Sequence, residues 1–203
     1  MRTTLFGVVV SAVLLTSAAA QDPAAVAAAV RELFEAGQYQ PVIEAAGEDA
    51  PPAVVYVAAL SHQKLGQAEQ AQAMARRLSS RPSDDPWHFV GLSVGQLAGS
   101  QVDEAVESAR SAVMLAGALP QAHYQLGLAL ARREAWRDAA VSFDRAGELD
   151  PGDAYAFYYG GLMHYRAGRR DVMAVRFERF LKLAPEAPER PEVQQIMRTI
   201  RGR

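Results

Sequence analysis

Residues 120–151 read PQAHYQLGLALARREAWRDAAVSFDRAGELDP, and this stretch decides the fold. Large and small apolar side chains alternate along it at helical spacing, as at Gly127, Trp136, Ala139 and Phe143. Apolar residues that recur at positions i, i+3, i+4 and i+7 indicate an amphipathic helix. The stretch is long enough for two such helices with a turn between them. We therefore predict that a pair of packed helices is the basic unit of the chain.

The same pattern recurs every thirty-four residues, without an insertion or a deletion. A period of this length is typical of helix-turn-helix solenoids. Glycine marks the turn between the helices in three units, at Gly66, Gly99 and Gly168. The units begin at Pro52, Pro86, Pro120 and Ala154 and fill residues 52–187, approximately as 52–85, 86–119, 120–153 and 154–187.

At one equivalent position of the second helix, the first three units all have alanine: Ala71, Ala105 and Ala139. Small side chains allow two helices to approach closely. In the last unit Met173 takes this place, and Phe180 follows seven residues later. We expect these larger side chains to meet a different neighbour, a terminal helix that caps the array.

These units resemble the tetratricopeptide repeat family. In the unit quoted above the resemblance is carried by Leu126, Gly127, Trp136, Ala139, Phe143, Ala146 and Pro151, and in the next by Phe157, Gly161, Gly168, Phe177 and Pro185. The two earlier units are looser, and the resemblance covers about residues 23 to 186. It implies an all-α fold, a right-handed α-solenoid of antiparallel helix pairs that forms a superhelix and presents a binding surface rather than a reactive pocket.

Both ends of the array depart from the repeat. Residues 21–51 fit a degenerate N-terminal repeat, with the turn at AGQY, residues 36–39. Residues 188–203 form a proline-rich connector and a C-terminal capping helix with a stripe at Val193, Ile196, Met197 and Ile200. The segment APEAPERP, residues 184–191, is alternatively a flexible tail. Its glutamates, with Glu192, are expected to face water.

Residues 1–20 have the form of a cleavable secretory signal peptide. Arg2 is the basic start, residues 5–15 are mainly apolar, and Ala18 to Ala20 form a cleavage site. The alternative, an uncleaved membrane anchor, needs about 20 apolar residues, more than this stretch has. The chain contains no cysteine, which excludes lipid attachment at cysteine and also disulfides. We expect an exported, periplasmic or secreted protein with no stable membrane anchor.

The composition and the absence of catalytic motifs favour binding over catalysis. Charged residues make up 22% of the chain and the formal net charge is −2, which gives no reason to expect a nucleic acid partner. The sequence has no HExxH, GxSxG or phosphate-binding GxxxxGK[ST] motif. His62 and His164 are separated by two repeats, and His88 and His123 lie near helix starts. We expect no catalytic residue, no metal site and no cofactor.

The resemblance also implies a concave groove, lined by five positions of each first helix. An apolar floor with aromatic walls and a basic edge suits an extended or helical peptide that carries aliphatic anchors and a carboxylate. The candidate groove residues are Tyr56, Leu60, Lys64, Trp87, Val94, Tyr124, Leu128, Arg132, Tyr155, Tyr158, Leu162, Tyr165 and Arg166.

Three questions stay open from the sequence. The tyrosines either contact a partner or pack between neighbouring first helices, where tyrosine is common in the repeat pattern. The groove accepts either a protein or peptide partner or, by self-association, a helix from a second copy. The function we expect is a non-catalytic interaction scaffold of the bacterial cell envelope. The alternative is an accessory or substrate-delivery subunit of an envelope enzyme, or of a pilus, secretion or outer-membrane assembly complex.

Overall fold

The computed structural model describes residues 22–201, and within them the only regular secondary structure is α-helix. The predicted signal peptide, residues 1–20, lies outside this range. Among the described residues, no helix has the length and apolar character that crossing a bilayer requires. The helices are α2 (Pro23–Glu35), α3 (Tyr39–Ala45), α4 (Pro52–Lys64), α5 (Ala68–Ser79), α6 (Pro86–Ala98), α7 (Val102–Leu115), α8 (Pro120–Arg132), α9 (Trp136–Leu149), α10 (Ala154–Arg166), α11 (Arg170–Leu183) and α12 (Arg190–Arg201).

Local sequence signals explain where the first helices begin. Proline occupies the first position of α2, α4, α6 and α8, where its missing N–H costs no helical hydrogen bond. Asp22 and Asp85 cap the N-termini of α2 and α6, each accepting a hydrogen bond of 2.9 Å from the backbone two residues on. Asp153 caps α10 in the same way.

The turn inside each unit needs a residue in the left-handed region. At equivalent places in the four units this residue is Gly66, Ser100, Glu134 or Gly168, with φ between 61° and 78°. Gly99, which marks the turn in the sequence of the second unit, is not its left-handed residue: its φ is −85° and Ser100 follows it at 61°. Glycine adopts this conformation at the lowest energetic cost, but the packing of the two helices imposes it on serine and glutamate as well.

The core runs between successive helix pairs. Ala71, Ala105 and Ala139 are at most 1% exposed, as expected for positions of close helix approach. Met173 and Phe180 are also buried, and α12 packs along α11 with Val193 fully buried beside them in the same core. The predicted capping helix thus completes the array.

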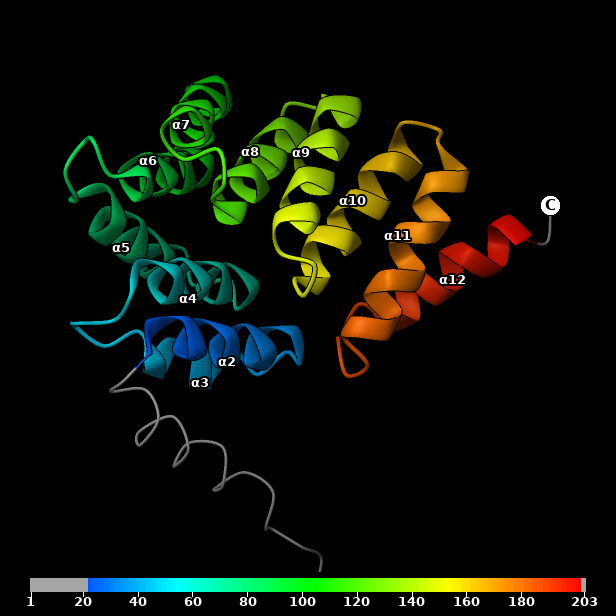
Figure 1. Ribbon diagram of the computed structural model, residues 1–203, viewed down its shortest axis with the longest axis horizontal. Helices are drawn as coiled ribbons and strands as arrows, with labels where there is room; N and C mark the ends of the chain where they lie inside the picture. The colour runs from blue at the N-terminus through cyan, green and yellow to red at the C-terminus, as the bar shows by residue number, and fades with distance from the viewer. Residues whose placement is uncertain (1–21, 202–203) are drawn as a thin grey trace, which may run out of the picture.

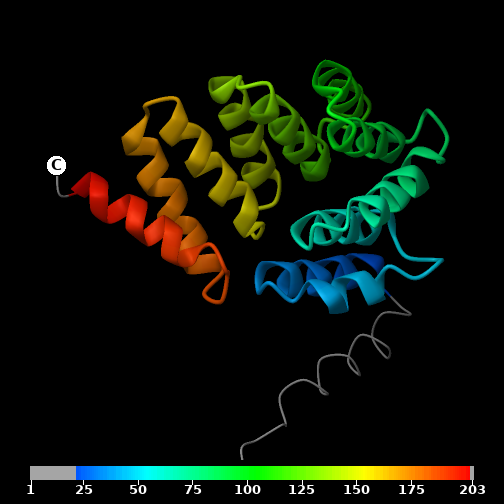
Figure 2. The same ribbon diagram turned by 180° about the vertical axis from the view of Figure 1, so that it is seen from behind.

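The helix pairs follow an arc that returns towards its start. Figure 1 and Figure 2 show α2, in blue, facing the beginning of α10 and the loop between α11 and α12. Side chains join these parts: Arg31 of α2 forms an ion pair with Asp150, and Lys64 of α4 forms one with Glu189. The first and last parts of the array therefore touch, and much of the concave surface is enclosed.

Candidate functional site

Four of the predicted groove tyrosines are buried inside the arc. Tyr56 and Tyr155 are 2% exposed, Tyr124 is 5% and Tyr158 is 6%. The rings pack edge to face: the centroids of Tyr56 and Tyr124 are 6.5 Å apart, and those of Tyr155 and Tyr158 are 5.8 Å apart. In this structure these four rings pack against their neighbours, and their contact with a partner stays a prediction.

A buried polar chain connects three first helices. The Tyr56 hydroxyl donates to Oε1 of Gln125 at 3.0 Å, and Nε2 of Gln125 donates to Oγ of Ser93 at 3.0 Å. Gln125 and Ser93 are fully buried. Burial raises the pKa of Tyr56 well above its ordinary value of 10, so the phenol stays protonated and acts as the donor. Buried groups with satisfied partners favour a single packing arrangement of these helices.

The remaining predicted residues differ in accessibility. Val94 is buried, and Trp87 is partly buried with its ring centroid 6.0 Å from that of Tyr56. Leu60, Leu128 and Leu162 are partly buried, whereas Tyr165, Arg132 and Arg166 are exposed. The Arg166 guanidinium lies over the Trp136 ring, 5.6 Å from its centroid.

An open groove of about 550 Å³ lies near the C-terminal ends of α6, α8 and α10. Leu97, Leu128 and Leu162 line it, together with the aromatic rings of Trp136 and Tyr159. Arg132 also lines it, and its side chain forms no ion pair or hydrogen bond with any of residues 22–201. The structure thus brings together two of the predicted floor leucines and one of the predicted basic residues.

The sequence analysis missed Trp136 and Tyr159 as groove residues. Trp136 belongs to the repeat pattern, and it begins the second helix α9, outside the first-helix positions that the resemblance assigned to the groove. Tyr159 follows Tyr158 on α10, and the resemblance assigned the repeat position of Tyr158, but not that of Tyr159, to the groove. The signal for both residues was their size, because a large ring reaches beyond the position at which its helix places it.

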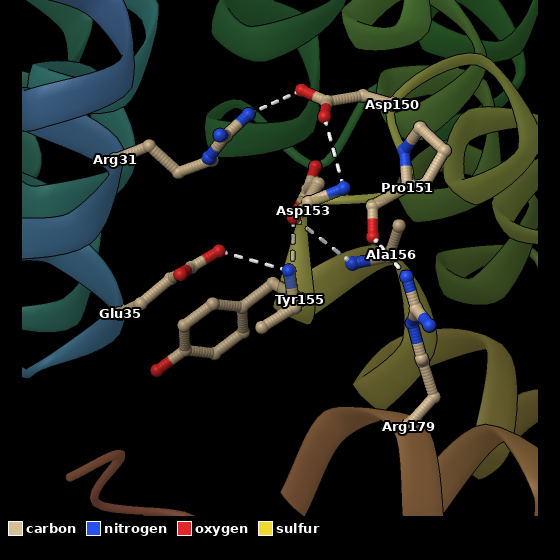
Figure 3. Close-up of polar contacts among 10 residues, drawn as sticks. Arg31, Glu35, Asp150, Pro151, Asp153, Tyr155, Ala156 and Arg179 are labelled. Carbon is tan, nitrogen blue, oxygen red and sulfur yellow. Dashed lines mark hydrogen bonds and ion pairs between the residues drawn. The ribbon is translucent and has the colours of Figure 1, made fainter. Parts of the chain in front are cut away.

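A second, more enclosed cavity of about 220 Å³ lies between α2, α4, α8 and α10, and charged residues line one side of it. Figure 3 shows Arg31 paired with Asp150, and Glu35 reaching the start of α10. The Glu35 carboxylate accepts a hydrogen bond of 2.8 Å from the Ala154 amide. The Asp153 carboxylate accepts bonds of 3.0 and 3.2 Å from the Tyr155 and Ala156 amides.

Both carboxyl groups lose hydration in this arrangement. Burial raises the pKa of Glu35 to about 7 from an ordinary 4.5, against the lowering effect of the Ala154 amide. Asp153 and Asp150 raise it further, and Arg31 lowers it. Burial likewise raises the pKa of Asp153 to about 6. The closed arc therefore holds protons more tightly than an unfolded chain does.

Because these pKa values are higher in the folded than in the unfolded protein, we predict that the free energy of unfolding falls as pH rises. The Glu35 contribution is complete below pH 4.5, the unfolded pKa, and is lost as pH rises through about 7, the folded pKa. Glu35→Gln keeps the acceptor for the Ala154 amide but cannot ionise. We expect the variant to be more stable than the parent by about 2 kcal/mol at about pH 8, with little difference at about pH 5. Thermal unfolding followed by circular dichroism measures this.

Glu32→Gln is the matched control, because Glu32 is exposed on the same helix. It should leave the pH dependence of the midpoint unchanged. Identical pH profiles for the parent and Glu35→Gln would contradict the prediction.

The histidines have separate surroundings. His62 Nδ1 lies 2.6 Å from Oε1 of Gln67, and His164 Nε2 lies 2.9 Å from Oδ2 of Asp144. His88 and His123 each contact a backbone carbonyl, of Arg81 and of Gly117. In the range 22–201 no three histidine, aspartate or glutamate side chains group as metal ligands would.

Comparison with known structures identifies the fold. A thermophilic TPR protein of Thermus thermophilus, TTC0263, aligns with a TM-score of 0.61 and 18% identity over 81% of this chain and 93% of that chain. YrrB, described as a TPR protein with an unusual peptide-binding site, gives 0.53 and 20% identity over 91% and 88%. MamA gives 0.50 and 17% over 76% and 86%. The sequence matches no family model and no curated protein.

The protein is thus an all-α solenoid with the tetratricopeptide-repeat fold, and the predicted fold class is confirmed.

Proposed function

We propose that this protein is a non-catalytic interaction scaffold that binds an extended or helical peptide segment of another protein. The observation that carries the proposal is the open groove of about 550 Å³, in which leucines and Trp136 lie beside Arg132. The tetratricopeptide-repeat fold supports it, because solenoids of this kind present extended concave surfaces for binding.

The groove defines the chemistry of the segment. Its floor of Leu97, Leu128 and Leu162 accommodates aliphatic or aromatic anchors, and the volume matches that of a site for a few side chains. Arg132 offers a planar set of donors that fits a carboxylate in two-point contact. We therefore propose a segment with spaced apolar side chains and one acidic group, without a dense charge.

We further propose that the protein acts outside the cytoplasm, in the periplasm or as a secreted protein. The support is the basic start, apolar stretch and Ala18–Ala20 site of residues 1–20. Sequencing the N-terminus of the protein purified from its own cells tests this. We expect the first residue to be Gln21, and an intact Met1 would contradict the proposal.

Fluorescence of Trp136 tests peptide binding in the groove. The chain has two tryptophans, so Trp87→Phe leaves Trp136 as the single reporter. The probes are decapeptides with leucines at helical spacing and one glutamate, each paired with a copy that carries glutamine instead. We expect the glutamate peptides to shift the emission and to bind about five-fold tighter than their glutamine copies.

Arg132→Gln should remove that five-fold difference. Arg145→Gln is the control with the same change of charge, because Arg145 is on the outer helix α9 and pairs with Glu148 at 3.0 Å. It should leave the difference intact. Failure of every peptide to shift the emission, or equal effects of the two arginine variants, would overturn the proposed site.

A further inference from the structure

Two of the residues predicted to contact a partner are held by the chain's own C-terminal segment. Nζ of Lys64 lies 2.7 Å from Oε1 of Glu189, and the Tyr155 hydroxyl donates to Oε2 of the same carboxylate at 2.6 Å. A third, Tyr158, donates to Oε2 of Glu192 at 3.2 Å. Both glutamates were expected to face water, and Glu192 is exposed, but the Glu189 side chain is only 13% exposed.

The site that holds Glu189 is built from distant elements. Lys64 ends α4, Tyr155 is in the first turn of α10, and Lys64 Nζ also lies 5.1 Å from the centre of the Tyr155 ring. Burial, and then the Glu189 carboxylate, raise the pKa of Tyr155 above its ordinary value, so its hydroxyl remains a donor. A cation and a phenol that both point at one carboxylate form a carboxylate-binding site.

The segment that supplies the carboxylate runs from residue 184 to residue 192, with the sequence APEAPERPE. Residues 184–189 join α11 to α12 and lie beside the N-terminal unit, as Figure 2 shows, and residues 190–192 form the first turn of α12. Pro188 packs so closely on Gly37 that a Cβ added to this glycine would lie 3.0 Å from Cγ of Pro188. The connection consists of turns, and a proline-containing segment loses little conformational entropy when it binds, because proline already restricts the backbone.

The carboxylate site and the open groove each share lining residues with one small cavity. A smaller cavity of about 190 Å³ is lined by Lys64, Leu60, Tyr124, Leu128 and Tyr159. Leu128 and Tyr159 also line the open groove. A peptide that fills the groove can therefore extend towards Lys64, and there it meets Glu189.

Ala184 and Ala187 anchor the segment in the core, whereas the polar contacts of Glu189 are of a kind that a competitor can replace. The Lys64 side chain is 27% exposed, and ion pairs that remain accessible to water contribute little net stability. An identical carboxylate from another chain would restore the same ion pair and the same hydrogen bond. The internal segment would then reduce the apparent affinity of that chain by the fraction of molecules in which the site is filled.

We propose that Glu189 and Glu192 are internal occupants of the binding surface, and that an acidic, proline-containing segment of a partner protein displaces these side chains and places its own carboxylate between Lys64 and Tyr155. This inference deepens the proposed function and rests on it, because it assumes that the concave surface binds a partner. It adds that the partner carries a carboxylate at this end of the surface, and that the internal glutamates restrict the access of the partner to its site.

Isothermal titration calorimetry with a synthetic peptide tests the inference. The probe is APEAPERPE, and its control is APQAPQRPQ. The receptor is the full chain, either as the parent or with Glu189→Gln and Glu192→Gln together. We expect APEAPERPE to bind the double variant about ten-fold or more tighter than the parent, because the internal occupant is weakened. The control peptide should bind neither receptor.

Two further variants separate binding from folding. Lys64→Met added to the double variant should abolish binding of APEAPERPE while the circular dichroism spectrum stays native. Glu186→Gln, at an exposed position of the same segment, should behave as the parent does. Equal affinities for the parent and the double variant, or no binding by a natively folded double variant, would overturn the inference.

The outcomes also distinguish this inference from the proposed function. If leucine-rich decapeptides shift Trp136 emission while APEAPERPE binds no variant, the inference fails and the proposed function stands. If neither probe binds, both fail. A parent protein that dimerises in sedimentation experiments, and loses the dimer with Glu189→Gln, would place the segment of a second copy in the site and overturn displacement by a partner.

Discussion

Replacing Phe143 by alanine is expected to lower the free energy of unfolding by about 3–5 kcal/mol. Phe143 is fully buried on α9, with its ring stacked on Tyr159 at 5.5 Å and edge-on to Tyr124 at 5.3 Å. Its ring also fills the space above Gly127, where an added Cβ would lie 2.9 Å away. Alanine would leave a cavity between three helices that the rigid neighbours cannot close.

Urea-induced unfolding followed by circular dichroism measures this loss. Val141→Ala is the matched control, since Val141 lies two residues earlier on the same helix and is 64% exposed. Its effect should stay within about 0.5 kcal/mol. A similar loss for both variants would mean that α9 packs with a different face.

Gly91→Ala is expected to destabilise the protein by about 3 kcal/mol. An added Cβ at Gly91 would lie 2.5 Å from the Ser79 amide nitrogen, 2.6 Å from Leu78 Cβ and 2.7 Å from the Ala75 carbonyl oxygen. Two of these atoms belong to the backbone of α5, so no side-chain rotation relieves the clash. The α5 and α6 helices would have to separate, and the buried contacts of both would weaken.

Gly95→Ala on the same helix is the control with the same chemical change. Its added Cβ would lie 3.7 Å from Ala75 Cβ, an ordinary contact. Alanine has a higher helix propensity than glycine, by about 1 kcal/mol in a helix interior. We therefore expect Gly95→Ala to leave the unfolding midpoint unchanged or to raise it. A midpoint for Gly91→Ala equal to that of Gly95→Ala would contradict the close approach of α5 and α6.

The helices could be predicted because their signals are local. Pro52, Pro86 and Pro120 mark the first residues of α4, α6 and α8, and the apolar period sets the face that each helix buries. The turn at Ser100 was harder to find. There the left-handed conformation follows from the packing of α6 on α7, and serine carries no sequence signal for it.

For the binding surface, only the repeat positions that face the groove could be predicted. Leu128 and Arg132 do line the open groove, because helical geometry places both on one stripe of α8. Tyr56 and Tyr124 occupy equivalent columns, yet they are buried in the interior of the arc. Tyr124 lies one helical turn before Leu128 on the same stripe of α8, and what differs is how far the opposite side of the superhelix has closed at that level.

The sequence by itself determined the helices, their pairing and the small residues that let them pack, since these depend on residues at most one repeat apart. Only the tertiary structure decided that the array closes, that Glu35 reaches the start of α10, and that Glu189 meets Lys64 125 residues away. The physical reason is that curvature is the sum of small rotations between successive helix pairs. The side-chain packing between neighbouring helix pairs sets each rotation. Contacts across the arc therefore depend on the sum of all these rotations, which no single repeat reveals.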